Sequence, residues 1–312
     1  MKATRWIFFG VMLALLTGCN QMLAERMVAP PNLRNATDAP PAACNTVVNG
    51  VRKIVLPVGP PKAMLSAWVL EPPAGKPVCG TVLVLHGIIV NHDWVRSAAE
   101  NFRTAGFRAV LVDLRGHGAS TGDHITYGVV ESQDLKQLTD YLQQNKLCGD
   151  TLGVYGVSYG AATAIQYAAI EPRVTAVVAV AAFATLREEA PNFGRHILPI
   201  PGLFLADADY ADVVTRAGKI ANFDPDAASP LAAIQKTKAH VLLIHGDLDL
   251  VTSVECSKRL HAAAPENSEL QILAGQGHAL ATLNVDPKVL EAAQKWLLRH
   301  AALIGIPFPA SK

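Results

Sequence analysis

Short apolar runs alternate with segments of helical periodicity over most of the chain. The run TVLVLHG (81–87) is continuously apolar, as expected of a strand that is buried on both faces. The segment 131–145 instead spaces its leucines at helical intervals, at Leu135, Leu138 and Leu142. Because strands that alternate with helices build parallel sheets, the pattern predicts an α/β fold, with a mostly parallel sheet and helices on both of its faces.

The same pattern places the remaining elements, with an antiparallel pair at the front of the sheet. In chain order, the predicted strands are 51–58, 63–73, 81–87, 107–116, the run that ends at 157, 174–182, 240–246 and 270–275. The predicted helices cover 93–106, 131–145, 159–170 and 286–303. We therefore expect one α/β domain over 45–305.

The segment 185–225 interrupts this alternation, because it mixes Pro, Phe, Leu and charged residues without a strand run. We interpret it as a short helical cap over the carboxyl edge of the sheet, and a plain surface loop is the alternative. The apolar residues of this cap suggest an acyl or aromatic substrate of modest size. They are Phe193, Ile197, Leu198, Leu203 and Phe204.

Composition narrows the classes of function. Of the 312 residues, 50% are hydrophobic and 17% are charged, which supports a large buried core and argues against disorder. The net charge of +1, without a basic run, argues against nucleic acid as a partner. The sequence has no His or Cys pairs at metal-ligand spacing and no glycine-rich phosphate loop, so we expect neither a metal nor another cofactor.

The N-terminus has the pattern of an export signal over 1–18. Basic residues precede an apolar stretch over 6–16, which is shorter than the roughly 20 residues that span a bilayer. The following LLTGC resembles the lipobox of bacterial lipoprotein precursors, which implies cleavage before Cys19 and acylation of this cysteine. By the same resemblance, Asn20 favours the outer membrane, facing the periplasm. An ordinary secretory signal with an incidental cysteine is the alternative.

We expect the acylated Cys19 to be followed by a tether, so that anchor and tether together cover 19–44. Paired prolines stand among Ala, Asn and Asp over 20–43, without apolar periodicity. Such a composition is typical of an extended and mobile segment.

An exported chain meets oxidising conditions, in which thiols can pair as disulfides. Cys79 and Cys148 each stand just before an apolar run. If those two runs are neighbouring parallel strands, both thiols lie at the same end of the sheet and a Cys79–Cys148 disulfide is expected. Buried or idle thiols are the alternative.

The stretch GVSYG sets Ser158 between Gly156 and Gly160, after one apolar run and before an alanine-rich one. To act as a nucleophile, serine needs an activating base and a position free of competing contacts. A sharp strand-to-helix turn provides that position, and flanking glycines remove side chains that would collide where strand and helix meet. Ser158 is therefore the candidate nucleophile.

The candidate acid and base come later in the chain. His278 lies in the glycine-rich AGQGHAL, directly after the last strand run, where an imidazole can swing over the turn. Asp249 in IHGDLDLVTS is our choice as the acid that orients this imidazole, and Asp247 is the alternative. The order Ser158, Asp249, His278 is the one expected of a nucleophile set on a strand-to-helix turn.

Two backbone N–H groups are candidate donors of an oxyanion hole. The N–H of Tyr159 stands at the start of the helix that follows the candidate nucleophile, and the positive end of a helix favours negative charge. The N–H of Ile88 follows the strand run that ends at His86. We expect structural roles for His86, His117 and His245, because each precedes the position where the base is needed.

Five motifs in this order and spacing, LVLHG, VDLRGHGAS, GVSYGAATA, LLIHGDLDLV and GQGHA, resemble the α/β-hydrolase superfamily. They are most similar to its serine aminopeptidase-like and monoacylglycerol lipase-like branch, over about residues 50–300. The resemblance implies an eight-stranded sheet, in which the strand that ends at His86 neighbours the strand that leads to Ser158. It also implies the same triad and oxyanion donors, and structural roles for Asp113 and Arg115. The cap matches no subfamily, so the substrate stays open.

The sequence thus predicts a serine hydrolase that cleaves small-molecule carboxylic esters without a cofactor, held at a membrane by its N-terminal lipid. Amide or peptide hydrolysis is the alternative among enzymes. For that activity Glu188, Glu189, Asp207 or Asp209 of the cap would pair with a substrate ammonium group. A lipoprotein that uses the fold to bind a ligand without catalysis is the alternative from another class, although no triad residue or turn glycine is missing.

Overall fold

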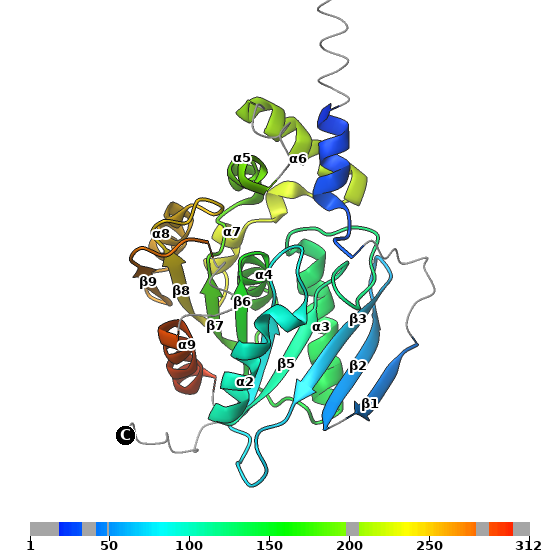
Figure 1. Cartoon of the computed structure of the whole chain (residues 1–312), viewed down its shortest axis with the longest axis vertical. Coiled ribbons are helices and arrows are strands. Elements are labelled where there is room, and N and C mark those ends of the chain that lie inside the picture. The colour runs from blue at the N-terminus through cyan, green and yellow to red at the C-terminus, as the bar shows by residue number, and fades with distance from the viewer. Residues whose placement is uncertain (1–18, 33–41, 49, 198–205, 279–286, 302–312) are drawn as a thin grey trace, which may run out of the picture.

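The computed structural model describes residues 19–32, 42–48, 50–197, 206–278 and 287–301 (Figure 1). The predicted signal over 1–18 lies outside them. In chain order, the strands are β1 (Cys44–Val48), β2 (Val51–Val58), β3 (Ala63–Leu70), β4 (Gly80–Leu85), β5 (Phe107–Asp113), β6 (Leu152–Val157), β7 (Val174–Val180), β8 (His240–Gly246) and β9 (Ser268–Leu273). The helices are η1 (His92–Val95), α2 (Arg96–Ala105), α3 (Val129–Gln144), α4 (Tyr159–Ala168), α5 (Leu186–Ile197), α6 (Asp207–Ala221), η3 (Pro225–Ala227), α7 (Pro230–Ile234), α8 (Val254–Ala263) and α9 (Pro287–His300).

The described strands form a single sheet in the order β1-β2-β3-β5-β4-β6-β7-β8-β9. β2 pairs antiparallel with β1 and β3, and β3 pairs antiparallel with β5. All the pairs from β5 to β9 are parallel. The predicted α/β architecture is confirmed, with its antiparallel pair at the front and β4 beside β6.

The sheet has nine strands among the described residues, and the expected number was eight. The additional strand is β1, which lies at the sheet edge and is mostly exposed, with Val47 at 59% and Val48 at 62% exposure. An edge strand that buries neither face carries no alternation of apolar and polar residues. The hydrophobic pattern therefore gave no sign of it.

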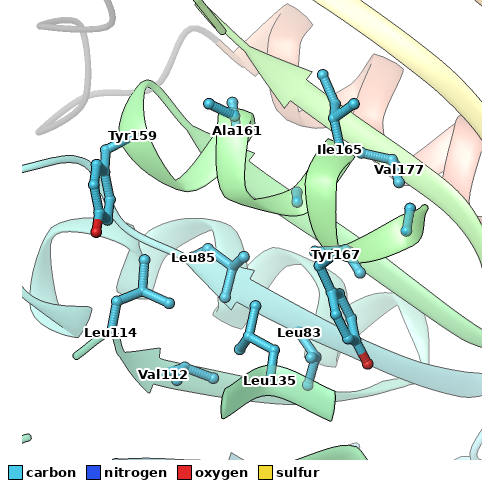
Figure 2. Close-up of a cluster of buried hydrophobic side chains, with 14 of the residues drawn as sticks. Leu83, Leu85, Val112, Leu114, Leu135, Tyr159, Ala161, Ile165, Tyr167 and Val177 are labelled. Atoms are coloured by element: carbon cyan, nitrogen blue, oxygen red, sulfur yellow. The ribbon is translucent and has the colours of Figure 1, made fainter. Parts of the chain in front are cut away.

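The side chains of β4 alternate between two hydrophobic cores. Leu83 and Leu85 pack with α3, α4 and α7 on one face of the sheet, and Figure 2 shows them in this cluster with Ile165 of α4. Val82 and Val84 pack with α2 and α9 on the other face. Because helices cover both faces, the parallel strands are continuously apolar, and the carboxyl edge of the sheet is left for a site.

The helices α5 and α6 form the cap predicted over 185–225, and they lie beyond one edge of the sheet (Figure 1). The alternative of a plain surface loop is wrong. The predicted cap residues Leu198, Leu203 and Phe204 lie outside the described residues.

Residues 19–28 form a helix, the N-terminal helix, which corrects the prediction of an extended tether for this part of the chain. Leu23, Ala24 and Val28 of this helix are buried against Val213 and Ala217 of α6. The helix therefore packs against the cap, and it stands next to α6 in Figure 1. The narrow apolar face of this helix is buried only because α6 lies against it. The sequence of residues 19–28 does not reveal that α6 is the partner. Residues 33–41 of the predicted tether lie outside the described residues.

The predicted Cys79–Cys148 disulfide is not formed, and both cysteines are free and buried. They do precede the neighbouring strands β4 and β6, but their side chains lie on opposite faces of the sheet. Cys79 packs in the core with Phe102, whereas the Cys148 Sγ lies in the other core, 3.7 Å from the carbonyl oxygen of Thr139. The backbone of the sheet separates the two thiols, so the geometry of a disulfide is out of reach.

Candidate active site

Ser158 stands in a sharp turn between β6 and α4, and its backbone is strained. Its φ of 53° and ψ of −114° lie in a region that residues other than glycine rarely adopt. The Ser158 N–H donates to the carbonyl oxygen of Val180 over 2.7 Å, which ties the turn to β7. Strain of this kind costs about 1–3 kcal/mol and marks the turn as a candidate functional site.

The two flanking glycines let β6 and α4 approach closely. A Cβ at Gly156 would lie 2.3 Å from the carbonyl oxygen of Gly160, and a Cβ at Gly160 would lie 2.5 Å from the carbonyl oxygen of His86. Atoms this close would overlap, so the turn could not keep its geometry with larger residues. The predicted role of these glycines is confirmed.

The imidazole of His278 links Ser158 to Asp249. Its Nε2 lies 3.1 Å from the Ser158 Oγ, and its Nδ1 lies 2.8 Å from the Asp249 Oδ2. Because a carboxylate only accepts, Nδ1 carries the proton and Nε2 is left to accept from the serine hydroxyl. The alternative acid, Asp247, is exposed and its Oδ1 accepts from the N–H of Gly275 over 2.6 Å. The structure thus brings together the three side chains that we chose from the sequence.

Asp249 is buried and is held by several hydrogen bonds. Its Oδ1 accepts from the N–H groups of Val251 and Thr252, over 2.9 and 2.8 Å. Burial alone would raise the pKa of Asp249, but the hydrogen bonds from His245, His278 and Thr252 outweigh burial and hold this pKa well below its usual value. The carboxylate is therefore ionised and oriented towards the imidazole.

His245 is a contact of Asp249 that the sequence did not reveal. Its Nε2 lies 2.9 Å from the carbonyl oxygen of Thr252 and 3.3 Å from the Asp249 Oδ2. Both of these atoms accept, so Nε2 carries a proton and Nδ1 accepts from the hydroxyl of Ser257 over 2.7 Å. We expected a structural role for His245, and the structure adds that it supports the candidate acid. The four-residue spacing was the available signal, but residues beyond a strand end have no fixed geometry.

Ile88 and Tyr159, whose N–H groups are the predicted oxyanion donors, line the same cavity as Ser158. Tyr159 is the first residue of α4, and the first N–H groups of a helix have no partner within the helix. They also carry the positive end of the helix dipole. The start of α4 therefore favours negative charge next to Ser158, and the assignment of the two N–H groups as oxyanion donors stays a prediction.

His86 orients the peptide that precedes the N–H of Ile88. The N–H of Leu114 donates to the His86 Nε2 over 3.0 Å, so Nδ1 carries the proton and donates to the carbonyl oxygen of Gly87 over 2.7 Å. In a planar trans peptide the C=O and N–H bonds point in opposite directions, so this contact turns the Ile88 N–H away from His86. Burial, with a further contribution from the neighbouring His117, lowers the pKa of His86 to about 3, which keeps this imidazole neutral.

A mostly apolar cavity opens beside Ser158 under the cap. Its empty volume is about 410 Å³, part of which is open to solvent. Its lining residues include Ser158, Tyr159, Leu186, Phe193, Met27 and Tyr127. Of the predicted cap residues whose side chains the structure describes, Phe193 lines it. Met27 was missed because it lies in the segment taken for a tether, and Tyr127 was missed because no pattern distinguishes it from a core aromatic residue.

Asp113 and Arg115 have the structural roles that we expected. The Asp113 Oδ2 accepts from the N–H of Ala119 over 2.7 Å, and the guanidinium of Arg115 donates to Asp134 over 2.8 and 2.7 Å. His117 donates from Nδ1 to the carbonyl oxygen of Arg115 over 2.8 Å. These bonds fix the loop after β5 next to the site.

The acidic cap residues differ in their positions. Glu189 lines the cavity. Glu188 instead pairs with Arg259 over 2.7 Å, and Asp207 pairs with Arg195. Within the described ranges, no group of three or more His, Cys, Asp or Glu side chains is arranged to hold a metal ion.

Two sequence comparisons relate this chain to known proteins. Residues 76–229, just under half of the chain, match the family model described as "Serine aminopeptidase, S33". The uncharacterised protein YqkD of Bacillus subtilis (strain 168) is 28% identical over 204 residues, which cover 64% of this chain. The match covers 65% of that relative, which is less than two thirds of its length.

Solved structures of esterases and other hydrolases share the fold. The Pyrococcus furiosus esterase Pf2001 has a TM-score of 0.65 at 20% identity, and the match covers 84% of this chain and 100% of that one. Est1E from Butyrivibrio proteoclasticus has a TM-score of 0.59 at 17% identity, with 78% and 98% covered. A puromycin-hydrolyzing peptidase of Mycobacterium tuberculosis has a TM-score of 0.62 at 19% identity, with 83% and 41% covered. The chain has the α/β-hydrolase fold, and the family match supports a hydrolase of that superfamily.

Proposed function

We propose that this protein is a serine hydrolase that cleaves carboxylic esters through an acyl-enzyme intermediate. The observation that carries the proposal is the hydrogen-bonded chain from Ser158 through His278 to Asp249, which ends at a strained turn beside an apolar cavity. The esterases among the structural neighbours are consistent with this activity.

The first half of the reaction acylates Ser158. The Nε2 of His278 takes the hydroxyl proton as the Oγ attacks the ester carbonyl carbon, and the oxyanion accepts from the N–H groups of Ile88 and Tyr159. Asp249 stabilises the imidazolium that forms. The imidazolium then gives its proton to the leaving alcohol, and the acyl group stays on the Oγ.

The second half releases the acid by the same route in reverse. A water molecule gives a proton to the Nε2 of His278 and attacks the acyl carbonyl carbon. The bond to the Oγ breaks, and Ser158 regains its proton from the imidazolium. The enzyme returns to its starting state, and the net reaction consumes one ester and one water.

The test is a panel of p-nitrophenyl esters of graded acyl length, measured beside aminoacyl amides. The wild type is expected to hydrolyse esters faster than amides. Ser158→Ala is expected to lower kcat by at least about 10⁴-fold without a change in thermal unfolding, because only a hydroxyl is lost. Full activity in Ser158→Ala would mean that the nucleophile is wrong.

A second candidate function, hydrolysis of peptides with a free amino terminus, is favoured by the position of Glu189 in the cavity wall. Its carboxylate could pair with a substrate ammonium group. The same carboxylate already accepts from Asn192 over 2.8 Å and from the Cys256 thiol over 3.0 Å. Because these contacts occupy the carboxylate, they favour ester hydrolysis over peptide hydrolysis. A peptidase would hydrolyse aminoacyl amides faster than their N-acetylated forms and lose this preference in Glu189→Gln, but not in the surface variant Glu188→Gln.

We also propose that Cys19 is acylated and holds the protein at the outer membrane, facing the periplasm. The proposal rests on the LLTGC motif, and several acyl chains on one residue would anchor it firmly. Among the described helices, none is both long and apolar enough to cross a bilayer. Cys19→Ser is expected to move the protein from the membrane fraction to the soluble fraction, and continued membrane association would count against acylation.

A further inference from the structure

We propose that Met27 is a specificity-determining residue, which closes the acyl side of the cavity and limits the length of the acyl chain. This inference rests on the proposed ester hydrolysis. It names the residue that determines which acyl lengths the site accepts. It gives the segment directly after the proposed lipid anchor a role in the site itself.

Met27 lines the same cavity as Ser158 and the candidate oxyanion donors, although it lies far from them in the sequence. The backbone at this point is fixed to the body of the protein. The hydroxyl of Tyr127 donates to the carbonyl oxygen of Met27 over 2.8 Å, and the N–H of Ile125 donates to the carbonyl oxygen of Val28 over 3.0 Å. The Met27 backbone is therefore fixed, and its partly buried side chain packs against the neighbouring hydrophobic clusters as part of the cavity wall.

The segment is also fixed on both sides of Met27. On the N-terminal side, Leu23 and Ala24 are buried against α6, and the Asn20 side chain donates to Asp212 over 3.0 Å. On the C-terminal side, the Asn32 side chain donates to the carbonyl oxygens of Gly118 and Ser120, over 3.0 and 2.7 Å. These contacts join the segment to both the cap and the loop after β5.

The position of the cavity assigns it to the acyl group and not to the leaving alcohol. The alcohol oxygen must lie close to the Nε2 of His278, which protonates it. His278 is not among the residues that line the cavity, whereas the candidate oxyanion donors Ile88 and Tyr159 are. An acyl chain that leaves the carbonyl carbon on the side away from His278 enters this cavity, whose wall includes Met27.

A methionine at this position limits the length of the acyl chain that fits in the cavity, and a smaller residue would remove this limit. Replacement by alanine deletes the three outer heavy atoms of the side chain and lengthens the cavity. A difference of one methylene in an apolar pocket changes kcat/KM by about 10–200-fold. The chain-length profile is therefore a sensitive measure of the position of this wall.

The experiment measures kcat/KM of the full chain on p-nitrophenyl esters from acetyl to dodecanoyl. Met27→Ala is expected to raise the ratio of kcat/KM for long over short esters by at least about tenfold, and Met27→Trp is expected to lower it by a similar factor. Met22→Ala is the matched control, because Met22 lies on the same helix, is 50% exposed and does not line the cavity. Its profile is expected to match the wild type.

The outcomes separate this inference from the proposed function. An active wild type with the same chain-length profile in Met27→Ala overturns the inference alone. An equal shift in Met22→Ala also overturns it, because the effect would then belong to the helix and not to the wall. A wild type that hydrolyses no ester overturns the proposed function, and the inference falls with it.

Discussion

The Nε2 atom of His278 lies 3.1 Å from the Oγ atom of Ser158, across 120 positions of sequence. Ser158 follows β6 and His278 follows β9, and β7 and β8 lie between these strands in the sheet. The loop of Asp249, which follows β8, carries the acid to the same imidazole. Because parallel strands present their carboxyl ends at one edge, the loops after them can bring distant residues to one point.

The choice between the two aspartates can be tested by paired amide variants. Asp249→Asn is expected to lower kcat by about 10⁴-fold, because an amide no longer holds the imidazole in the correct tautomer. Asp247→Asn is expected to leave kcat within the same order of magnitude, since Asp247 is exposed and contacts the backbone of Gly275. The measurement is steady-state ester hydrolysis by both variants, and the reverse order of effects would make Asp247 the acid.

The close packing at the turn predicts that one added methyl group at Gly156 destabilises the protein. Gly156→Ala is expected to lower the free energy of unfolding by about 1–3 kcal/mol or more, because its Cβ would lie 2.3 Å from the carbonyl oxygen of Gly160. Gly277→Ala is the control, since among the described residues beyond its chain neighbours the nearest atom to its Cβ, the carbonyl oxygen of Leu248, would lie 3.9 Å away. Urea unfolding of both variants checks this, and equal stabilities would mean that the turn is looser than described.

The buried His86 predicts a loss of stability in mild acid. Its pKa is about 3 in the folded protein and about 6.5 in an unfolded chain, so between these values only the unfolded state binds the proton. The free energy of unfolding therefore falls as the pH falls below about 6.5, with a contribution from His86 of about 1.4 kcal/mol per pH unit.

His86→Asn removes this titration while it keeps a donor near the carbonyl oxygen of Gly87. Urea unfolding between pH 7 and pH 5 is expected to show a shallower dependence in the variant than in the wild type. If the free energy of unfolding depended on pH equally in both proteins, the pKa of His86 would not be lowered by folding.

The core strands and the candidate triad were predictable because their signals are local. A strand buried on both faces is continuously apolar wherever it lies, as 81–87 shows. The glycines beside Ser158 indicate a turn at which larger side chains would collide with the backbone. The loops after the later strands determine which later residues can reach this turn. The strands and the turn need no knowledge of distant partners, and the acid and base need only the order of the strands along the chain.

The features that could not be predicted depend on a partner elsewhere in the chain. The helix over 19–28 is defined by its contact with α6, which no pattern within 19–28 specifies. Cys79 and Cys148 stand at the expected end of the sheet, but the face that each side chain takes depends on strand register. The contact of His245 with Asp249 arises from the path of a loop after β8.

The most direct measurement is active-site labelling with a fluorophosphonate, which reacts covalently with an activated serine. We predict one labelled site in the wild type, at Ser158, and no labelling of Ser158→Ala or His278→Ala, each shown to be folded by its unfolding curve. A folded wild type that remains unlabelled, or labelling that persists in Ser158→Ala, would contradict this prediction.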